Sequence, residues 1–422
     1  MYLLILNNNN NNMKTLNTIA TLLLFAGGIF AQSNIANIDE TGNGQKATID
    51  QKGILNKSYV IQATKDNTAT ITQINKNDKT NTFSEVLQTG ATNNATVEQT
   101  SNARFPIITG KIEAHITQSG NNNDAKQVQG PHSFQGTSFA EIIQGGNNNY
   151  ASQHQVKFGN VAKTNQSGNN NSARQGQDIE LLPEEEGSMN NASIDQSGSG
   201  NTATQLQNGL ANSAKINEAG NGNAAEQNQY GSFNWAKASQ SGNLNTSIQS
   251  QKMAQNNSAE VDQSGNSNAA TQIQYLGLAN NAYAIQSGDF NTFIQKQMGT
   301  FNDADVLQSG NFNLANQNQI GTKNKAKIDQ ASINSKAFQV QKSDLLGSTI
   351  KNNAEIYQLG GNENYAMQNQ DSPSGSSVLN DAFIRQEGSL NFATQTQLGG
   401  DNASAINQTG NSSNAVVTQT MP

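Results

Sequence analysis

The sequence contains no cysteine, only three histidines and five prolines, and charged residues make up 13% of its 422 residues. The absence of cysteine excludes disulfide frameworks, zinc–thiolate sites and cysteine nucleophiles. Lysine and arginine number 24 against 31 aspartates and glutamates, so there is no excess of positive charge to bind phosphates. The composition therefore argues against a disulfide-rich scaffold and against a nucleic-acid-binding protein.

Carboxamide side chains are abundant instead. The chain has 66 Asn and 46 Gln, while hydrophobic residues account for only 33%. A typical globular domain has nearly half apolar residues. Low charge with many amides is typical of two classes, disordered prion-like chains and β-rich polymers stabilised by amide ladders. The periodicity of the sequence distinguishes between them.

The N-terminal region predicts export. Met13 and Lys14 open a short polar stretch, an apolar run follows over residues 19–30, and polar residues begin after Ala31. This order is typical of a secretory signal peptide, which we assign to residues 13–31. The run is shorter than the roughly 20 apolar residues of a membrane span. Residues 1–12 precede Met13 as an upstream, non-structural extension, and residues 32–422 are predicted not to span a membrane.

An 11-residue repeat runs through the remaining chain. Glutamines recur at intervals of 11 residues, for example from Gln286 to Gln341. Between Glu40 and Gln419 there are 32 such anchor positions, 30 of them Gln, with Glu40 and Glu218 as the exceptions. Of the 31 intervals, 22 are 11 residues long, three are 12 and six are longer. A repeat this regular predicts a repeat architecture rather than a disordered chain.

Each repeat unit has a fixed internal pattern. After anchor Gln308, Gly310 stands at position two, Asn313 at five, Ala315 at seven and Gln317 at nine, before the next anchor at eleven. Positions five, seven, nine and eleven alternate, which is the period of a β-strand with one buried face. Glycine, which accepts positive φ, predicts the reversal between strands. We expect strands of about five residues separated by turns of about six.

One such strand cannot bury a face alone, so successive units must stack. We therefore predict an all-β solenoid with two short strands per 22-residue rung, about 16 rungs and parallel, in-register stacking. Inward amides one rung apart would hydrogen-bond along the axis, and an unpaired buried amide would cost roughly 1–3 kcal/mol. The predicted ladder residues are Gln196, Gln207, Gln229, Gln240, Gln263, Gln274, Gln286, Gln297, Gln308, Gln319, Gln330, Gln341, Asn201, Asn223, Asn291 and Asn313. Gln408 and Gln419 are predicted to form an assembly end.

The long intervals have a common parity. They begin at Gln73, Gln99, Gln129, Gln177, Gln341 and Gln370, which are all even-numbered anchors when Glu40 is the first. Alternate intervals turn at opposite edges of a two-strand rung, so all six insertions are predicted at one edge. Four of the five prolines, Pro106, Pro131, Pro183 and Pro373, fall in these intervals, and we expect proline to be kept out of central strands.

The repeat resembles that of the curlin family. The motif Gln-x-Gly-x-x-Asn-x-Ala-x-x-x-Gln is carried by Gln196, Gly198, Asn201, Ala203 and Gln207, and recurs over nearly the whole chain after residue 31. Family repeats usually carry Ser six residues before the first Gln, where this chain has Asn, as at Asn190, Asn212 and Asn234.

The resemblance implies a secreted structural subunit of curli-like amyloid fibres. Such a subunit would polymerise with copies of itself at the cell surface and serve biofilm matrix formation, adhesion and cell aggregation. The implied partners are a minor nucleator subunit and an outer-membrane secretion channel. The chain is longer than a typical five-repeat curlin.

Catalytic chemistry finds little support in the sequence. His115, His132 and His154 lie at unrelated phases of the repeat, and Glu184–Glu186 fall in a long interval beside Pro183, so we predict no catalytic, cofactor-binding or metal-binding residue. Two other readings remain open. One is a monomeric ligand-binding or adhesive solenoid, which would need a flat face of a repeated outward residue such as Thr, and no such face is visible in the sequence. The other is a right-handed β-helix acting on polysaccharides, which would need irregular rungs and a clustered Asp, Arg or Lys site, neither of which appears in the sequence.

Overall fold

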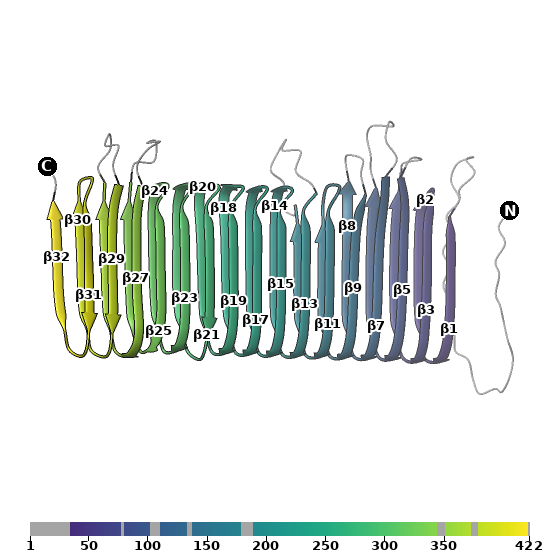
Figure 1. The fold of residues 1–422 in the computed structure, drawn as a ribbon. Coiled ribbons are helices and arrows are strands. Elements are labelled where there is room, and N and C mark those ends of the chain that lie inside the picture. The colour runs from purple at the N-terminus through teal and green to yellow at the C-terminus, as the bar shows by residue number, and fades with distance from the viewer. Residues whose placement is uncertain are drawn as a thin grey trace.

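The computed structural model describes residues 34–76, 80–101, 110–132, 137–178, 189–343, 351–372 and 379–420. Over these residues every regular element is a β-strand, and the strands stack into a two-sheet solenoid along which the chain advances from one end to the other (Figure 1). These ranges contain no helix long and apolar enough to cross a membrane. The predicted extension (1–12), the signal peptide (13–31), Glu184–Glu186, Pro106, Pro183 and Pro373 lie outside the described residues.

The odd-numbered strands form one sixteen-stranded sheet, called sheet A, in chain order. Its strands are β1 (Ile35–Asn43), β3 (Asn56–Lys65), β5 (Thr80–Ala91), β7 (Gly110–Asn121), β9 (Ser138–Asn147), β11 (Val161–Asn169), β13 (Asn191–Ser199), β15 (Ser213–Asn221), β17 (Trp235–Asn243), β19 (Ser258–Asn266), β21 (Asn281–Ser287), β23 (Asp303–Asn311), β25 (Lys325–Ile333), β27 (Lys351–Asn362), β29 (Leu379–Glu387) and β31 (Ala403–Thr409).

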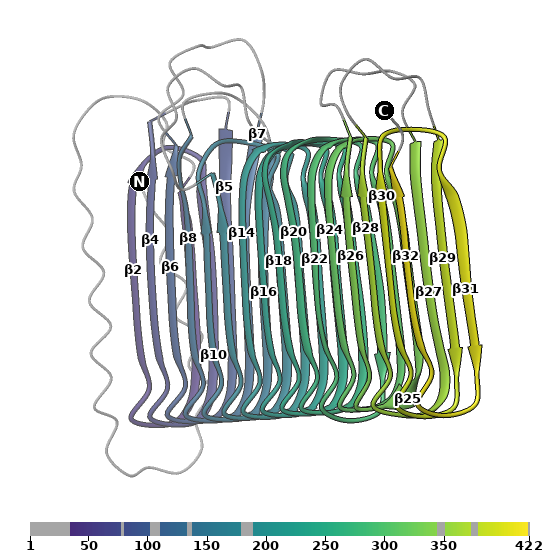
Figure 2. The ribbon, with the colours of Figure 1, turned by 90° about the vertical axis from the view of Figure 1, so that its left-hand side faces the viewer.

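The even-numbered strands form a second sixteen-stranded sheet, sheet B, also in chain order (Figure 2). Its strands are β2 (Lys46–Gly53), β4 (Thr68–Asn75), β6 (Asn94–Ser101), β8 (Asp124–His132), β10 (Tyr150–Gln155), β12 (Ser172–Gln177), β14 (Thr202–Leu210), β16 (Ala224–Ser232), β18 (Thr246–Gln255), β20 (Ala269–Leu278), β22 (Thr292–Thr300), β24 (Leu314–Thr322), β26 (Lys336–Lys342), β28 (Tyr365–Asp371), β30 (Phe392–Leu398) and β32 (Asn414–Thr420).

Neighbouring strands in each sheet are parallel and in register. Gln286 of β21 pairs with Gln308 of β23, which pairs with Gln330 of β25. In sheet B, Gln297 of β22 pairs with Gln319 of β24. The predicted solenoid, with two strands per rung and parallel in-register stacking of about 16 rungs, is confirmed.

The core is a thin layer between the two sheets. In β23 the side chains of Ala304, Val306 and Gln308 are buried, and the residues between them are partly exposed. In sheet A an aliphatic residue such as Ile194 or Ile328 precedes the anchor by two, except at Thr164, whereas in most of sheet B that position is Gln. Alternation with period two therefore sets the inward face of each strand, as the pattern predicted.

The strands are longer than predicted. Most contain seven to ten residues and some contain twelve, so they extend past the anchor into the expected turn, as β13 does through Gln196 to Ser199. The reason is that turn residues also stack on their equivalents one rung away, so backbone pairing continues from Ser197–Ala219 to Ser199–Asn221. The chain bends at the glycine without leaving the hydrogen-bonded ladder.

The glycine two residues after the anchor meets a steric constraint as well as a conformational one. Gly198 has φ of +98°, and a Cβ added there would lie 2.1 Å from the carbonyl oxygen of Gly220 in the next rung. Two residues later the chain is again left-handed, and this position accepts other residues, including Phe290 and Phe312 with φ of 58° and 59°. The rings of these two residues stack with centroids 4.9 Å apart.

One proline departs from its prediction. Pro131 lies in β8, near its C-terminal end. Regular pairing of β8 with β10 ends at Gln129–Gln155, and pairing with β6 shifts between Gln99 and Ser101. The missing N–H of Pro131 therefore falls beyond the regular part of the ladder, where it removes no in-register bond.

The ends of the strands that flank the six long intervals lie at one edge of the solenoid. Each interval joins an even-numbered strand to the next odd-numbered one, as from β4 to β5, β12 to β13 or β26 to β27. Because the strands of each sheet are parallel, the C-terminal ends of sheet B all lie at the same edge. The opposite edge carries only the short odd-to-even turns, seen along the lower edge in Figure 1.

Candidate functional site: amide ladders and the open ends of the solenoid

The anchor glutamines of sheet B form a continuous hydrogen-bonded column. Each Nε2 donates to the Oε1 of the next anchor toward the C-terminus, without a break from Gln51 to Gln419, with N–O distances of 2.8–3.0 Å. This column contains the sequence-predicted residues Gln207, Gln229, Gln274, Gln297, Gln319 and Gln341. Every bond points the same way, so the column has a polarity, with a donor at its C-terminal end.

The anchors of sheet A form a second column with the same polarity. It contains the sequence-predicted residues Gln196, Gln240, Gln263, Gln286, Gln308 and Gln330, and from Gln240 to Gln330 the N–O distances are 2.7–2.8 Å. Each amide also donates across the core to a backbone carbonyl of the other sheet, as Gln240 does to Ala224 at 3.1 Å. The anchors thus join successive rungs and the two sheets.

The asparagines five residues after the anchors fix the turns. Asn201 Nδ2 donates to the carbonyls of Ser197 at 2.9 Å, within its own turn, and of Gly220 at 2.9 Å, in the next rung. Its Oδ1 accepts the backbone N–H of Asn223 at 3.0 Å. Asn291 and Asn313 repeat this link at 3.0 Å. The predicted asparagines therefore satisfy turn carbonyls that would otherwise be unpaired.

A third column consists of inward position-nine glutamines that were not among the predicted ladder residues. Twelve glutamines two residues before the sheet B anchors, from Gln127 to Gln395, donate in sequence at 2.7–3.0 Å. Val97 precedes the column and Val417 follows it. The sequence does contain this pattern, because Gln at position nine precedes even-numbered anchors only. It becomes visible when the repeats that end at even-numbered anchors are aligned separately from those that end at odd-numbered anchors.

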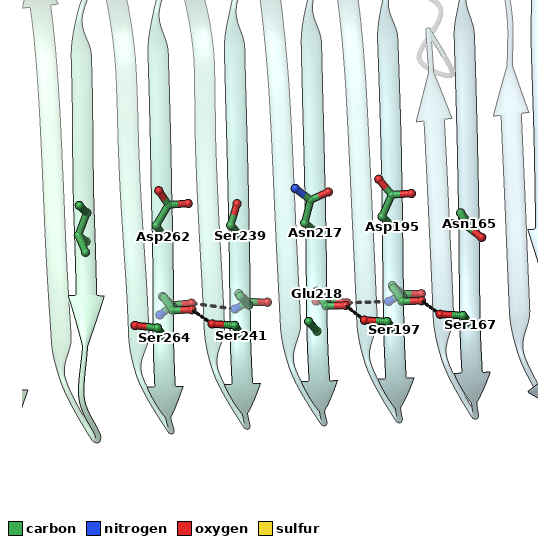
Figure 3. A pocket seen from close by; sticks show the side chains of 15 residues that line it. Asn165, Ser167, Asp195, Ser197, Asn217, Glu218, Ser239, Ser241, Asp262 and Ser264 are labelled. Carbon is green, nitrogen blue, oxygen red and sulfur yellow. Dashed lines mark hydrogen bonds between the residues drawn. The ribbon is translucent and has the colours of Figure 1, made fainter.

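The sheet A column is interrupted at Glu218. Gln196 Nε2 donates to Glu218 Oε2 at 2.7 Å. A carboxylate has no N–H group that could donate to the next anchor, Gln240. As a result, both Glu218 Oε1 and Gln240 Oε1 are buried without a hydrogen-bond partner among the described residues. Burial raises the pKa of Glu218 to about 8, although the Gln196 amide and the Ala225 backbone N–H favour the charged form. Figure 3 shows the bonded pairs on either side of this interruption.

A shallow groove of about 500 Å³ lies on the outer face of sheet A above Glu218, lined by Asn165, Asp195, Asp262 and a column of serines. Ser167, Ser197 and Ser241 donate to backbone carbonyls one rung away (Figure 3). Ser264 does the same to the carbonyl of Gln286. These hydroxyl groups therefore hydrogen-bond successive rungs to each other. The described residues include no group of three or more His, Asp or Glu side chains placed to hold a metal ion.

The predicted assembly-end residues lie on the last rung. Gln408 of β31 accepts from Gln386 at 2.8 Å, and Gln419 of β32 accepts from Gln397 at 2.9 Å. Their own Nε2 groups donate to the carbonyls of Phe392 and Ala403. Over residues 34–420 as the structure describes them, β31 and β32 each have a strand neighbour on one side only, and so do β1 and β2 at the other end.

Of the three histidines, His115 lies on sheet A and contacts Glu85 at 3.2 Å, and His154 lies on sheet B. The backbone of His132 ends β8. Burial, with a smaller contribution from Lys126, lowers the pKa of His154.

A comparison with protein families matches residues 42–74 to the curlin associated repeat. This stretch spans part of β1, all of β2 and β3 and most of β4. No curated protein matches the chain. The match confirms the resemblance drawn from the repeat motif, and together with the solenoid fold it supports a curli-like structural or adhesive protein.

Proposed function

We propose, taking the curlin associated repeat of residues 42–74 as the premise, that this chain is a secreted subunit of curli-like amyloid fibres at the cell surface. In this role it would polymerise with copies of itself and contribute to biofilm matrix, adhesion and cell aggregation. A minor nucleator subunit and an outer-membrane secretion channel are the partners that this function requires.

The observation that supports this proposal is that both ends of the described solenoid have unpaired strand edges. Among the described residues, β31 and β32 end the sheets with one edge each unpaired by a strand, and β1 and β2 do the same. An unpaired strand edge presents backbone N–H and C=O groups that pair readily with another chain. The side-chain columns reinforce this, because Gln419 ends a column of donors and Gln51 begins it with an acceptor.

Growth would then proceed by strand addition. The β31–β32 end of one copy would meet the β1–β2 end of the next, and the backbone ladders would continue across the junction with the register used inside the chain. Each added copy buries two strand edges and offers two new ones, which is the repeating step that a fibre needs.

The test is fibre formation by the processed chain, residues 32–422, followed by thioflavin fluorescence and electron microscopy. Gln408→Lys with Gln419→Lys would place unpaired charges in the two columns at the growing end, and we expect much slower elongation. Asn407→Lys with Thr418→Lys is the matched control, because these neighbours are exposed on the same strands. Equal elongation by both double variants would contradict end-to-end strand addition.

A monomeric adhesive solenoid is the second candidate, and one feature favours it. Thr48, Thr70 and Thr96 form an outward column on sheet B, where the sequence had shown no repeated threonine face. The column ends at the next rung, where Thr96 pairs with Lys126. Three rungs form a small flat surface, so strand addition remains the better-supported function. A chain that stays monomeric but adheres to a surface would favour this second candidate.

A further inference from the structure

Glutamate replaces glutamine at two of the 32 anchors, and both replacements lie in sheet A. Glu218 is in β15, inside the solenoid, and Glu40 is in β1, on the first rung. Each leaves the Oε1 of the next anchor in sheet A without a donor. Gln62 Oε1, one rung after Glu40, is buried without a hydrogen-bond partner among the described residues, as is Gln240 Oε1, one rung after Glu218.

The interior site shows what such a glutamate does when both neighbours are present. Glu218 accepts from Gln196 on one side and faces the orphaned Gln240 Oε1 on the other. Two carbonyl-type oxygens without a donor between them are costly in a buried site. Protonation of the Glu218 carboxyl group would give both oxygens a partner. Its O–H would donate to Gln240 Oε1 and replace the N–H that glutamine supplies elsewhere in the column.

Among the described residues, Glu40 has only one of these neighbours, Gln62. Its rung is the first in sheet A, and its side chain is half-buried, whereas Glu218 is fully buried. If a second copy continues sheet A in the register of β29 and β31, Gln408 meets Glu40 just as Gln386 meets Gln408. The same register places Ile406 on Ile38, and in sheet B it places Gln419 on Gln51.

We propose that the junction between two copies is closed by Glu40 in its protonated form. Glu40 would accept from Gln408 Nε2 of the preceding copy and donate its O–H to Gln62 Oε1 of its own chain. The junction would then repeat the Gln196–Glu218–Gln240 arrangement, with one proton taken from water for each copy added. This inference rests on the proposed fibre function and specifies its partner, a second copy, and its pH dependence.

The charges around Glu40 do not oppose this. Burial raises the pKa of Glu40 already in the single chain, with a smaller opposing effect from the backbone N–H of Ala47. The incoming strands β31 and β32 carry no charged residue, and neither does β4. The charged residues on β1 and on the packed strands β2 and β3 occupy outward, partly or fully exposed positions: Asp39, Lys46, Asp50, Lys52, Lys57 and Lys65.

The sign of the pH dependence follows from proton uptake. A carboxyl group whose pKa rises on docking binds more protons in the fibre than in the free chain, so the fibre is favoured at low pH. This advantage is lost as the pH rises through the window between the free and the docked pKa. For one proton per junction, the critical concentration should increase by up to about tenfold per pH unit in that window.

The experiment measures the soluble concentration in equilibrium with seeded fibres at pH 5, 6, 7 and 8 for three chains of residues 32–422. The wild type should show a critical concentration that rises with pH. Glu40→Gln, which installs the residue found at 30 other anchors, should remove most of this rise. Glu218→Gln is the control, because its site is internal and complete, and it should keep the wild-type slope.

The outcomes separate the two levels of inference. Fibres whose critical concentration rises equally with pH in wild type and Glu40→Gln, or does not rise in wild type, would overturn the protonated junction and leave strand addition standing. A loss of the slope in Glu218→Gln but not in Glu40→Gln would also overturn it, by assigning the proton to the interior site. Failure of all three chains to form fibres at any pH would refute the fibre function and the junction with it.

Discussion

At the scale of single residues, the repeat separates positions that need glycine from positions that only favour it. The glycine two residues after the anchor lies against the backbone of the next rung, whereas the left-handed position two residues later can carry a side chain, as at Phe290 and Phe312. Gly198 and Gly200 occupy these two positions in one turn, between β13 and β14. This pair therefore allows steric and conformational costs to be measured separately.

We expect Gly198→Ala to be far more destabilising than Gly200→Ala. At Gly198 a methyl group would meet the Gly220 carbonyl at 2.1 Å with φ of +98°, whereas at Gly200 nothing lies within 4 Å and φ is +69°. Gly200→Ala should lower the free energy of unfolding by about 1–2 kcal/mol, because alanine is strained in the left-handed conformation. Gly198→Ala should lower it by about 1–3 kcal/mol more, because the methyl group overpacks the contact with the next rung. Thermal unfolding of the monomer followed by circular dichroism would test this, and equal losses would contradict the close contact between rungs.

Glu218 gives a residue-scale prediction for stability against pH. Its folded pKa of about 8 lies above the unfolded value of 4.5, so the folded chain holds a proton that the unfolded chain releases. The stability contribution is complete below pH 4.5 and is lost as the pH rises to about 8, by roughly 1.4 kcal/mol per unit at most. Glu218→Gln should flatten this decline. Melting temperatures of both chains from pH 5 to 8.5 would measure it, and parallel curves would show that Glu218 does not carry the proton.

At the scale of elements, the sequence predicted the stacking better than the strand lengths. Anchor spacing determines which residues face each other between rungs, because inserted residues are accommodated in turns, and Gln274, Gln297 and Gln319 accordingly lie in one column. The strand ends could not be derived from alternation within one unit, because pairing beyond the anchor depends on contacts with the next rung. Position-nine glutamines such as Gln205 and Gln317 lie only in sheet B. This could not be predicted from one repeat unit, because the 11-residue period gives the two strands of a rung the same pattern.

A buried column should be more sensitive to substitution than the strand surface beside it. Gln319→Leu would remove the acceptor of Gln297 Nε2 and the donor to Gln341 Oε1. Each buried group left unpaired costs roughly 1–3 kcal/mol, so we expect a substantial loss of stability. Asn318→Leu, on the outward side of the same strand β24, should change stability by less than about 0.5 kcal/mol. Thermal unfolding of the two variants would compare them, and similar losses would show that the column contributes little.

At the scale of the whole molecule, the solenoid is asymmetric in two directions. Along its axis, the amide columns give it a donor end at Gln419 and an acceptor end at Gln51. Across its width, the flanks of all six long intervals lie at the even-to-odd edge, while the other edge carries short turns throughout. The first asymmetry orients growth. The second leads us to propose that the short-turn edge is kept smooth for lateral packing of fibres or passage through the export channel.

Paired insertions at the two edges of one rung test this proposal. Five Gly and Ser residues inserted after Leu210 extend the β14–β15 connection at the even-to-odd edge, and the same insertion after Asn221 extends β15–β16 at the short-turn edge. Flexible residues added to a surface loop cost little, about 0.6 kcal/mol per doubling of loop length, so both chains should fold with similar melting temperatures. Only the insertion after Asn221 should then reduce fibre bundling in electron micrographs or the amount of protein exported. If both insertions leave bundling and export unchanged, or impair them equally, the short-turn edge has no separate role, and the parity of the long intervals requires another cause.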